Sequence, residues 1–177
     1  MTNRSGSIFV RLGAAVVLTL VAFAELQNWV RNAELWGATR LVQLIGFGGL
    51  GPSSGSSVVV TPASHDPFRV VVSQSCSSLA SVLAIGCLAL LAPNHGSCRK
   101  AAASAAAMGV IVGGNVLRIA GSLGMGLVAG RPSLVLFHDS IGNVFSFAYT
   151  LGGYILLLWL LLPSGEPAAR RAVRVDS

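Results

Sequence analysis

Three residues far apart in the chain carry side chains that could act together on a carbonyl: Cys76, Arg118 and His138. A thiol attacks well as a thiolate, and a nearby imidazole can take its proton and later protonate a leaving amine. An arginine held against the carbonyl supplies cationic donors that stabilise the charge developing on its oxygen. The three residue types therefore predict a nucleophilic site.

Each residue also has a simpler interpretation when taken alone. Cys76 could be a small core side chain, Arg118 one partner of an architectural charge pair, and His138 an interfacial or capping residue. Arg118 interrupts an apolar segment and His138 opens one, and charge in such places is costly and usually functional. Asn115 and Ser122 lie three before and four after Arg118, so they share its helix face and could orient the guanidinium.

The composition indicates an integral membrane protein. Hydrophobic residues make up 53% of the chain and charged residues 10%, against about 25% charged in ordinary soluble domains, and the mean hydropathy is +0.73. Most arginines lie in the two tails and in short connections, so the net charge of +6 indicates topology and not nucleic-acid binding. Three cysteines without a secreted framework predict free thiols. The histidines and cysteines lack ligand spacing, so we expect no metal and no cofactor.

The N-terminal third contains one clear apolar run and one ambiguous run. Residues 8–30 are long enough for a first spanning helix. A cleaved signal peptide is the alternative, and residues 25–29 make a poor small-residue cleavage site for it. Residues 32–51 either span the membrane or lie flat on it, because Arg40 and Gln43 fall in the middle of this run.

A β-hairpin is expected next. The strand-like runs 58–61 and 68–73 flank a polar tip at residues 62–67. An open two-stranded ribbon cannot lie exposed in hydrocarbon, because its backbone groups would lack partners, so the hairpin should lie outside the bilayer or against protein. Residues 77–92 then form a short apolar helix with Cys76 at its mouth.

Two further helices follow a basic connection. Residues 101–129 predict a long helix of small residues that is interrupted at 113–115. A Gly-Arg-Pro-Ser sequence at 130–133 should break this helix, and residues 141–162 form the clearest span of the chain.

These elements together predict an all-α integral membrane protein: a bundle of four or five transmembrane helices with a small extracytoplasmic β-hairpin before the Cys-bearing helix. Residues 1–177 would form a single membrane domain, with its core at about 32–162 and a basic cytoplasmic tail at 163–177. Lysines and arginines of short loops prefer the cytoplasm. That rule places the three candidate catalytic residues on the extracytoplasmic side of the plasma membrane.

The residues around these three positions resemble the signature of the exosortase/archaeosortase family of membrane transpeptidases. The resemblance covers about residues 32–162. Its motifs are a cysteine at a helix start, an asparagine three before an arginine, and a glycine four after a histidine: Cys76 with Ser77 and Ser78, Asn115 with Arg118, and His138 with Gly142.

The resemblance implies a cysteine peptidase or transpeptidase that cleaves the C-terminal sorting signal of exported proteins. Such a signal consists of a short motif, a transmembrane helix and a basic cluster. By this resemblance Cys76 would form a thioester, Arg118 would steady the oxyanion and His138 would handle the proton. A lipid or glycan acceptor would then release the product. The family usually has glycine two residues after the cysteine, where this chain has Ser78.

Two other classes of function stay open on the sequence alone. The chain could be a non-catalytic assembly or scaffold subunit of an export or surface-polymer system, with Arg118 and His138 as a structural polar pair. It could also be a small transporter or ion pathway that uses the same two residues as a relay. The relay predicts further ionisable groups at depth, and residues 140–165 contain none.

Overall fold

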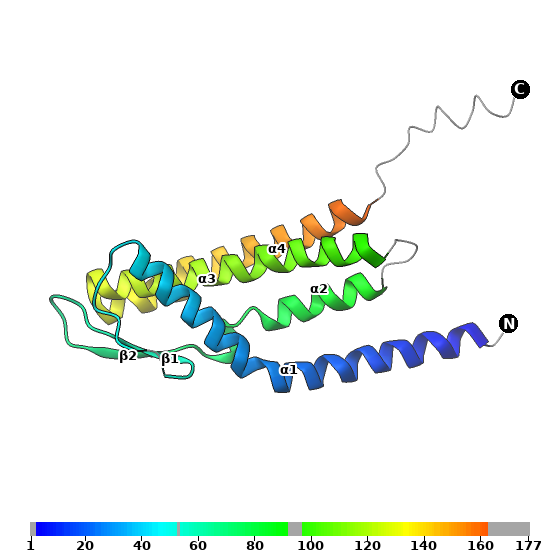
Figure 1. Ribbon diagram of the computed structural model, residues 1–177, viewed down its shortest axis with the longest axis horizontal. Helices are drawn as coiled ribbons and strands as arrows, with labels where there is room; N and C mark the ends of the chain where they lie inside the picture. Colours follow the sequence, from blue (N-terminus) through cyan, green and yellow to red (C-terminus); the bar gives the residue numbers. More distant parts are fainter. Residues whose placement is uncertain (1–2, 53, 92–96, 163–177) are drawn as a thin grey trace, which may run out of the picture.

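The structure is a computed structural model, and it describes residues 3–52, 54–91 and 97–162. Helices dominate it, and one two-stranded sheet packs against one side of the helices, near the end of the molecule where the long third helix reverses (Figure 1). In chain order the elements are α1 (Asn3–Leu44), β1 (Ser57–Val60), β2 (Phe68–Val71), the 3₁₀ turn η1 (Gln74–Cys76), α2 (Leu79–Leu91), α3 (Ser97–Leu136), the π turn η2 (Phe137–Ile141) and α4 (Gly142–Leu161).

The longest feature is a helical hairpin that reverses inside α3. Ala129 and Gly130 leave the helical conformation there, and Gly130 has a φ of 76°, which suits glycine. Residues 97–128, here the outgoing arm, are followed by residues 131–161, the returning arm, which includes η2 and α4. The predicted break at 130–133 is therefore confirmed. The ring of His65, in the β-hairpin tip, packs against Gly130.

The two arms pack closely along their length, as Figure 1 shows for α3 and α4. A glycine at each of several contacts gives room for a large neighbour. A Cβ on Gly153 would lie 2.7 Å from the side chain of Ile111, and one on Gly114 would lie 2.4 Å from the ring of Tyr149. The predicted interruption at 113–115 is wrong: α3 runs through it. The ring of Tyr149 packs against this stretch at Gly114.

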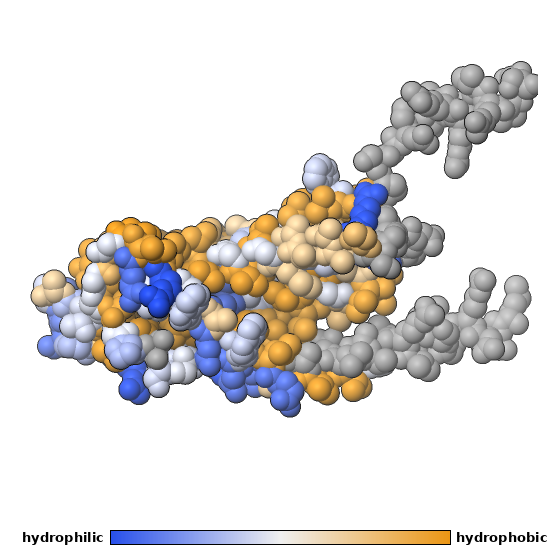
Figure 2. All heavy atoms as spheres, in the orientation of Figure 1, coloured by the Kyte–Doolittle hydropathy of each residue, from blue (hydrophilic) through white to orange (hydrophobic). Residues whose placement is uncertain are grey.

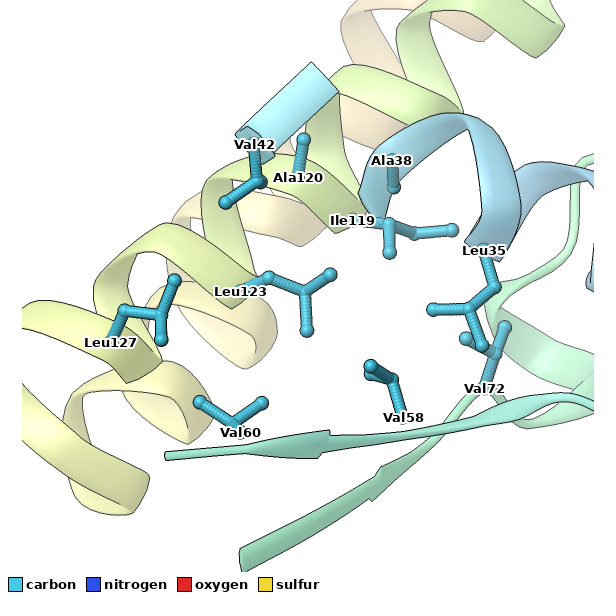
Figure 3. Packing of buried hydrophobic residues seen from close by; sticks show 10 residues of the cluster. All are labelled: Leu35, Ala38, Val42, Val58, Val60, Val72, Ile119, Ala120, Leu123 and Leu127. Atoms are coloured by element: carbon cyan, nitrogen blue, oxygen red, sulfur yellow. The ribbon is translucent and has the colours of Figure 1, made fainter. Parts of the chain in front are cut away.

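The β-hairpin is confirmed. β1 and β2 pair antiparallel, with Ser57 opposite Val71 and Val60 opposite Phe68. Val58 and Val60 on the inner face of β1 pack with the C-terminal half of α1 and with α3, as Figure 3 shows. The buried members of this cluster are Leu35, Ala38, Val42, Val58, Val60, Val72, Ile119, Ala120, Leu123 and Leu127. The sheet is thus held against α1 and α3 next to the reversal of the helical hairpin.

The predicted bundle of four or five transmembrane helices is wrong. Within the residues that the structure describes, one run, Cys98–Leu161, is long and apolar enough to cross a membrane by length and composition. That run contains both arms of the helical hairpin. α2 has 13 residues, which is about 20 Å of helix, well short of the ~30 Å hydrocarbon core.

The N-terminal prediction also needs correction. The run at 8–30 and residues 32–44 of the second run are one helix, α1, of 42 residues, and residues 45–51 lie beyond its end. No glycine or proline lies between residues 14 and 36, so nothing in that stretch breaks the helix. Polar residues cluster near its middle, among them Glu25, Arg31 and Glu34. Arg99, placed by the sequence in a connection, lies in the first turn of α3. The basic tail at 163–177 lies outside the described residues.

Large apolar side chains remain exposed along both arms. Leu117, Val128, Phe147, Ile155 and Trp159 are each more than half exposed. On the face shown in Figure 2, hydrophobic residues cover much of α3 and α4, whereas hydrophilic residues gather near the β-hairpin. Apolar surface of this extent indicates contact with lipid or with another protein.

Gly153→Ala should destabilise the helical hairpin. The added methyl group would meet Ile111 and the backbone oxygen of Ala107, and overpacking of this kind costs about 1 to 3 kcal/mol. Gly109→Ala is the matched control, since a Cβ there meets no atom within 4 Å, and alanine raises helix propensity. Thermal unfolding in detergent checks the pair. Equal midpoints for both variants would show that the two arms do not pack as described.

Candidate active site

Cys76 is held by a tight turn that follows the second strand. The chain leaves β2, and the N–H of Cys76 donates to the carbonyl oxygen of Ser73 at 3.1 Å. The N–H of Ser77 donates to the carbonyl oxygen of Gln74 at 3.2 Å. Cys76 therefore ends η1, just before α2 and not inside it. The turn fixes its backbone on the side of the sheet that faces α3.

The structure brings the three sequence-predicted side chains together. Cys76 Sγ lies 3.2 Å from His138 Nε2, and Arg118 Nη2 lies 3.4 Å from the same ring nitrogen. Arg118 comes from the outgoing arm and His138 from η2 of the returning arm. The reversal at Ala129–Gly130 is what carries His138 back beside Arg118. Their catalytic roles stay a prediction.

The contacts of His138 indicate which ring nitrogen bears its proton. A guanidinium N–H can only donate, so Arg118 Nη2 requires a lone pair on Nε2. The other nitrogen, Nδ1, lies 3.5 Å from Ser122 Oγ, and that hydroxyl donates to the carbonyl oxygen of Arg118 at 3.0 Å. Ser122 thus accepts from Nδ1–H. The neutral ring then presents Nε2 to Cys76 as a base.

The environment of Cys76 lowers the pKa of its thiol from 9.0 to about 7. Burial raises the pKa, but hydrogen bonds with His138 and Ser73, together with the positive charge that His138 carries once it has taken the thiol proton, lower the pKa by more. Ser73 Oγ lies 3.1 Å from the sulfur. Because the thiolate is the nucleophilic form, a substantial fraction of Cys76 is reactive at neutral pH.

Arg118 is buried, with 5% of its surface exposed, and its guanidinium is only partly satisfied. Nη2 donates to Asn143 Oδ1 at 3.2 Å as well as to the histidine. Nε is buried and has no hydrogen-bond partner among the described residues. A Cβ on Gly142 would lie 2.9 Å from Nε, so glycine is needed there to let the guanidinium approach. This geometry explains the glycine four residues after His138.

The turn η1, which carries Cys76, does not provide a backbone oxyanion hole. The N–H groups of Cys76 and Ser77 are both used within η1, so they are not free to bind a developing oxyanion. Arg118 is the cationic donor next to the thiol–imidazole pair, because its Nη2 contacts the same nitrogen of His138 as the thiol does, whereas its Nε is buried against Gly142. Arg118 is therefore the residue that would stabilise negative charge on the oxygen of an attacked carbonyl.

Asn115 connects the nucleophile to both arms. Its Nδ2 donates to the carbonyl oxygen of Cys76 at 2.8 Å, and its Oδ1 accepts from the hydroxyl of Tyr149 at 3.0 Å. Asn115 is 1% exposed. Asn115 therefore positions the peptide of Cys76. The expectation that it orients the guanidinium of Arg118, drawn from their shared helix face, is wrong for this side chain.

Ser78 is tied to the first helix. Its N–H donates to Glu34 Oε1 at 3.1 Å, and its hydroxyl makes a second, short hydrogen bond to the same oxygen. Both residues are buried. The serine at the position where the family that the chain resembles usually has glycine thus points toward α1 and has a hydrogen-bond partner there. Ser77 Oγ accepts from the N–H of Leu79 at 3.3 Å, which caps the start of α2.

Sequence reasoning missed Glu34, Ser73, Asn143 and Tyr149. Glu34 lies in a polar stretch of α1 that gives no sign of a contact 44 residues away. Ser73 had a usable signal, since a hydroxyl three residues before a cysteine in a turn can reach the sulfur. The positions of Asn143 and Tyr149 depend on the register between the two arms, which local patterns do not specify.

A small apolar cavity opens beside the sulfur. It has a volume of about 90 Å³ and its lining includes Cys76, His138 and Val71. Among the described residues, no group of three His, Cys, Asp or Glu side chains could hold a metal ion. Cys87 and Cys98 lie on α2 and α3, away from this cavity, and none of the three cysteines forms a disulfide.

The arrangement defines a thiol–imidazole pair with an adjacent guanidinium, which is a geometry suited to acyl transfer. No protein-family model, no curated protein and no solved structure matches the chain. The likeness to exosortases and archaeosortases therefore remains a prediction that rests on the residues quoted above.

The pH dependence of Cys76 alkylation tests the thiol–imidazole pair. With iodoacetamide, and with labelling of each cysteine followed by mass spectrometry, the rate at Cys76 should rise with a midpoint near pH 7. His138→Gln removes the largest contribution that lowers the pKa and leaves burial, which raises it, so the midpoint should move well above 7. Ser73→Ala should shift it less, in the same direction. Cys98 supplies the internal reference. An unchanged midpoint in His138→Gln would contradict the pairing.

The Glu34–Ser78 contact predicts that replacing Glu34 destabilises the protein more than replacing Glu25, which lies on the same helix. Glu34→Ala leaves the N–H and hydroxyl of Ser78 buried without an acceptor, which costs about 1 to 3 kcal/mol of unfolding free energy. Glu34→Gln keeps an acceptor oxygen and should lose less. Glu25→Ala, at an exposed position, should stay within about 0.5 kcal/mol of wild type. Thermal unfolding measures the midpoints of the three variants. Equal midpoints for Glu34→Ala and Glu25→Ala would contradict the contact between Glu34 and Ser78.

Proposed function

We propose that the chain is a membrane-embedded cysteine peptidase or transpeptidase, with Cys76 as nucleophile, His138 as base and acid, and Arg118 as oxyanion donor. The observation that carries the proposal is the convergence of Cys76 Sγ and Arg118 Nη2 on one nitrogen of His138, at 3.2 and 3.4 Å. The residues belong to three separate elements, and their types supply the nucleophile, base and electrophile that acyl transfer requires.

The first half of the reaction follows from these contacts. His138 Nε2 takes the thiol proton, and the sulfur attacks the substrate carbonyl carbon to form a C–S bond. Once protonated, Nε2 no longer accepts from Arg118, so the Nη2 N–H is released toward the new oxyanion. The tetrahedral intermediate collapses with loss of the amine, which takes its proton from His138. The product of this half is a thioester on Cys76.

The second half returns the enzyme to its starting state. An acceptor nucleophile gives its proton to His138 and attacks the thioester carbon, after which the C–S bond breaks. The leaving thiolate is stabilised by the hydrogen bonds and the charge that lower the pKa of Cys76. His138 then returns its proton to the sulfur, which restores the thiol and the neutral imidazole. A lipid or glycan amine or hydroxyl would complete transpeptidation, and water in its place would give simple hydrolysis.

The substrate class comes from the family resemblance. Exported proteins with a C-terminal sorting signal, consisting of a short motif, a transmembrane helix and a basic cluster, would be cleaved at the motif. Exposed apolar side chains on both arms, such as Leu117 and Phe147, are compatible with a substrate helix or lipid lying beside them.

The distances along the outgoing arm support a site at the extracytoplasmic membrane surface. Arg99 and Lys100 mark the start of α3 and would lie on the cytoplasmic side. From Lys100 to Arg118 the helix rises about 27 Å, close to the ~30 Å of the hydrocarbon core. The β-hairpin and Gly130 would then lie beyond the bilayer, with both arms of the helical hairpin crossing the plasma membrane.

The proposal is tested by expressing Cys76→Ala, Arg118→Ala and His138→Ala in the native host. The size of an exported protein with a C-terminal helix and basic tail is followed. Precursor should accumulate in all three variants, and the loss with Cys76→Ala should be complete because no other thiol reaches His138. Membrane fractions are probed for each variant to show that it is still present.

Cys87→Ala is the matched control, because this cysteine lies on α2 outside the cavity, and it should process normally. Normal processing with Cys76→Ala would show that Cys76 is not the nucleophile. The competing function is then a scaffold subunit, in which Arg118, His138 and Asn143 form a structural polar cluster. In that case Arg118→Ala and His138→Ala would lower the amount of protein in the membrane, whereas Cys76→Ala would leave both the amount of protein and the processing unchanged.

A further inference from the structure

The outer edge of β2 has no partner strand. In an antiparallel pair, every second residue of a strand hydrogen-bonds to the partner strand. Just after β2, the N–H of Val72 donates to the carbonyl oxygen of Ser56 at 2.8 Å. Counting back by twos, Val70 and Phe68 also face β1. Arg69 and Val71 therefore direct their N–H and carbonyl groups away from β1. Within the described part of the chain the sheet has two strands only, so this edge is open.

The two edges of the sheet differ. The outer edge of β1 is occupied, because Gly51 N–H donates to Val59 O at 2.9 Å and Thr61 N–H donates to Gly49 O at 2.7 Å. No equivalent segment covers β2 among the described residues. Val71 is 60% exposed. An edge strand left open in this way is a template for an added strand.

The open edge leads directly to the nucleophile. β2 ends at Val71, and Cys76 lies five residues further on, at the end of η1. The apolar cavity lies between them and the helical hairpin, because its lining joins Val70, Val71 and Val72 to Cys76 and His138. Ile119, Ser122, Leu123 and Leu134 complete the lining from the two arms. The edge, the cavity and the sulfur form one continuous surface.

We propose that the peptide substrate binds as a third, extended strand on the free edge of β2, with an aliphatic side chain next to the scissile bond filling the cavity. This inference rests on the proposed function for its peptide substrate. Backbone N–H and carbonyl groups at strand spacing are complemented by another extended peptide. A lipid chain has no such groups, and a second copy of β2 paired here would close off Cys76.

The cavity limits the side chain that fits. An enclosed cavity of about 150 Å³ holds benzene, so a cavity of about 90 Å³ favours a side chain of the size of valine over phenylalanine. Leu134 of the returning arm contributes to the lining and is partly buried. Pairing with Arg69 and Val71 would fix the register, so that one defined residue enters the cavity and its carbonyl reaches the sulfur.

Acetylated tetrapeptide chloromethyl ketones that end in alanine, valine or phenylalanine test the proposal on the full chain in detergent. The Cys76 sulfur displaces chloride from each reagent, and chloroacetone is the matched reagent without a peptide. Mass spectrometry follows the labelling rate at Cys76. In wild type the valine peptide should react faster than the phenylalanine peptide, and Leu134→Ala should narrow that difference.

Val71→Pro removes the outward N–H and suits an edge strand. It should lower the valine-peptide rate, relative to chloroacetone, about fivefold, which is typical for one hydrogen bond. Val71 also lines the cavity, so Val71→Thr, which retains the N–H, measures the effect of the changed side chain alone, and the fall in the ratio with Val71→Pro should exceed the fall with Val71→Thr. A peptide N-methylated at its pairing amide should show the same loss on the unmodified wild-type chain, so the test stands even where Val71→Pro fails to fold.

An unchanged ratio with both Val71→Pro and the N-methylated peptide would overturn the proposal. A change of oligomeric state in Val71→Pro without a change in that ratio would assign the edge to a second copy instead. The labelling ratio does not depend on turnover. Normal processing by Cys76→Ala in cells, together with edge-dependent labelling, would therefore refute the proposed function and leave the peptide-binding edge in place.

Discussion

A buried guanidinium sets the strongest constraint on this fold. Arg118 is 5% exposed, and an arginine removed from water must find hydrogen bonds or cost several kcal/mol. Its partners, His138 and Asn143, both come from the returning arm, and Gly142 leaves the space that its Nε requires. The reversal at Gly130 and the register of the two arms are thus fixed at the same place where the thiol meets the imidazole.

The nucleophile depends on parts of the chain that are distant in sequence. The peptide that follows Cys76 is held from one side by Asn115 of α3 and from the other by Glu34 of α1 through Ser78. The sheet in turn packs on both helices through the cluster around Val58 and Leu123. A cysteine placed in this way keeps its orientation without depending on the short helix α2, and this rigidity is what positions a reacting atom well.

The sequence predicts local elements of this structure better than contacts between distant segments. The β-hairpin and the break at Gly130 follow from local patterns, because strand alternation and Gly-Arg-Pro-Ser act within a few residues. Isolated polar residues in apolar surroundings likewise single out the three candidate residues, Cys76, Arg118 and His138. The number of membrane spans was overestimated, since apolar composition does not reveal that the run at 8–30 and residues 32–44 belong to one continuous helix. The role of Glu34 could not be predicted, because it arises only when α1 packs against the turn after Cys76.

The isolation of Cys76 from the other thiols has a consequence for redox chemistry. A thiol with a pKa of about 7 is oxidised readily to sulfenic acid, and a second cysteine nearby usually rescues it as a disulfide. Cys98 lies 20 residues before Arg118 on the same arm, about 30 Å away along the helix, and Cys87 is outside the cavity. The oxidised sulfur would have no internal thiol to resolve it, so recovery would require an external reductant.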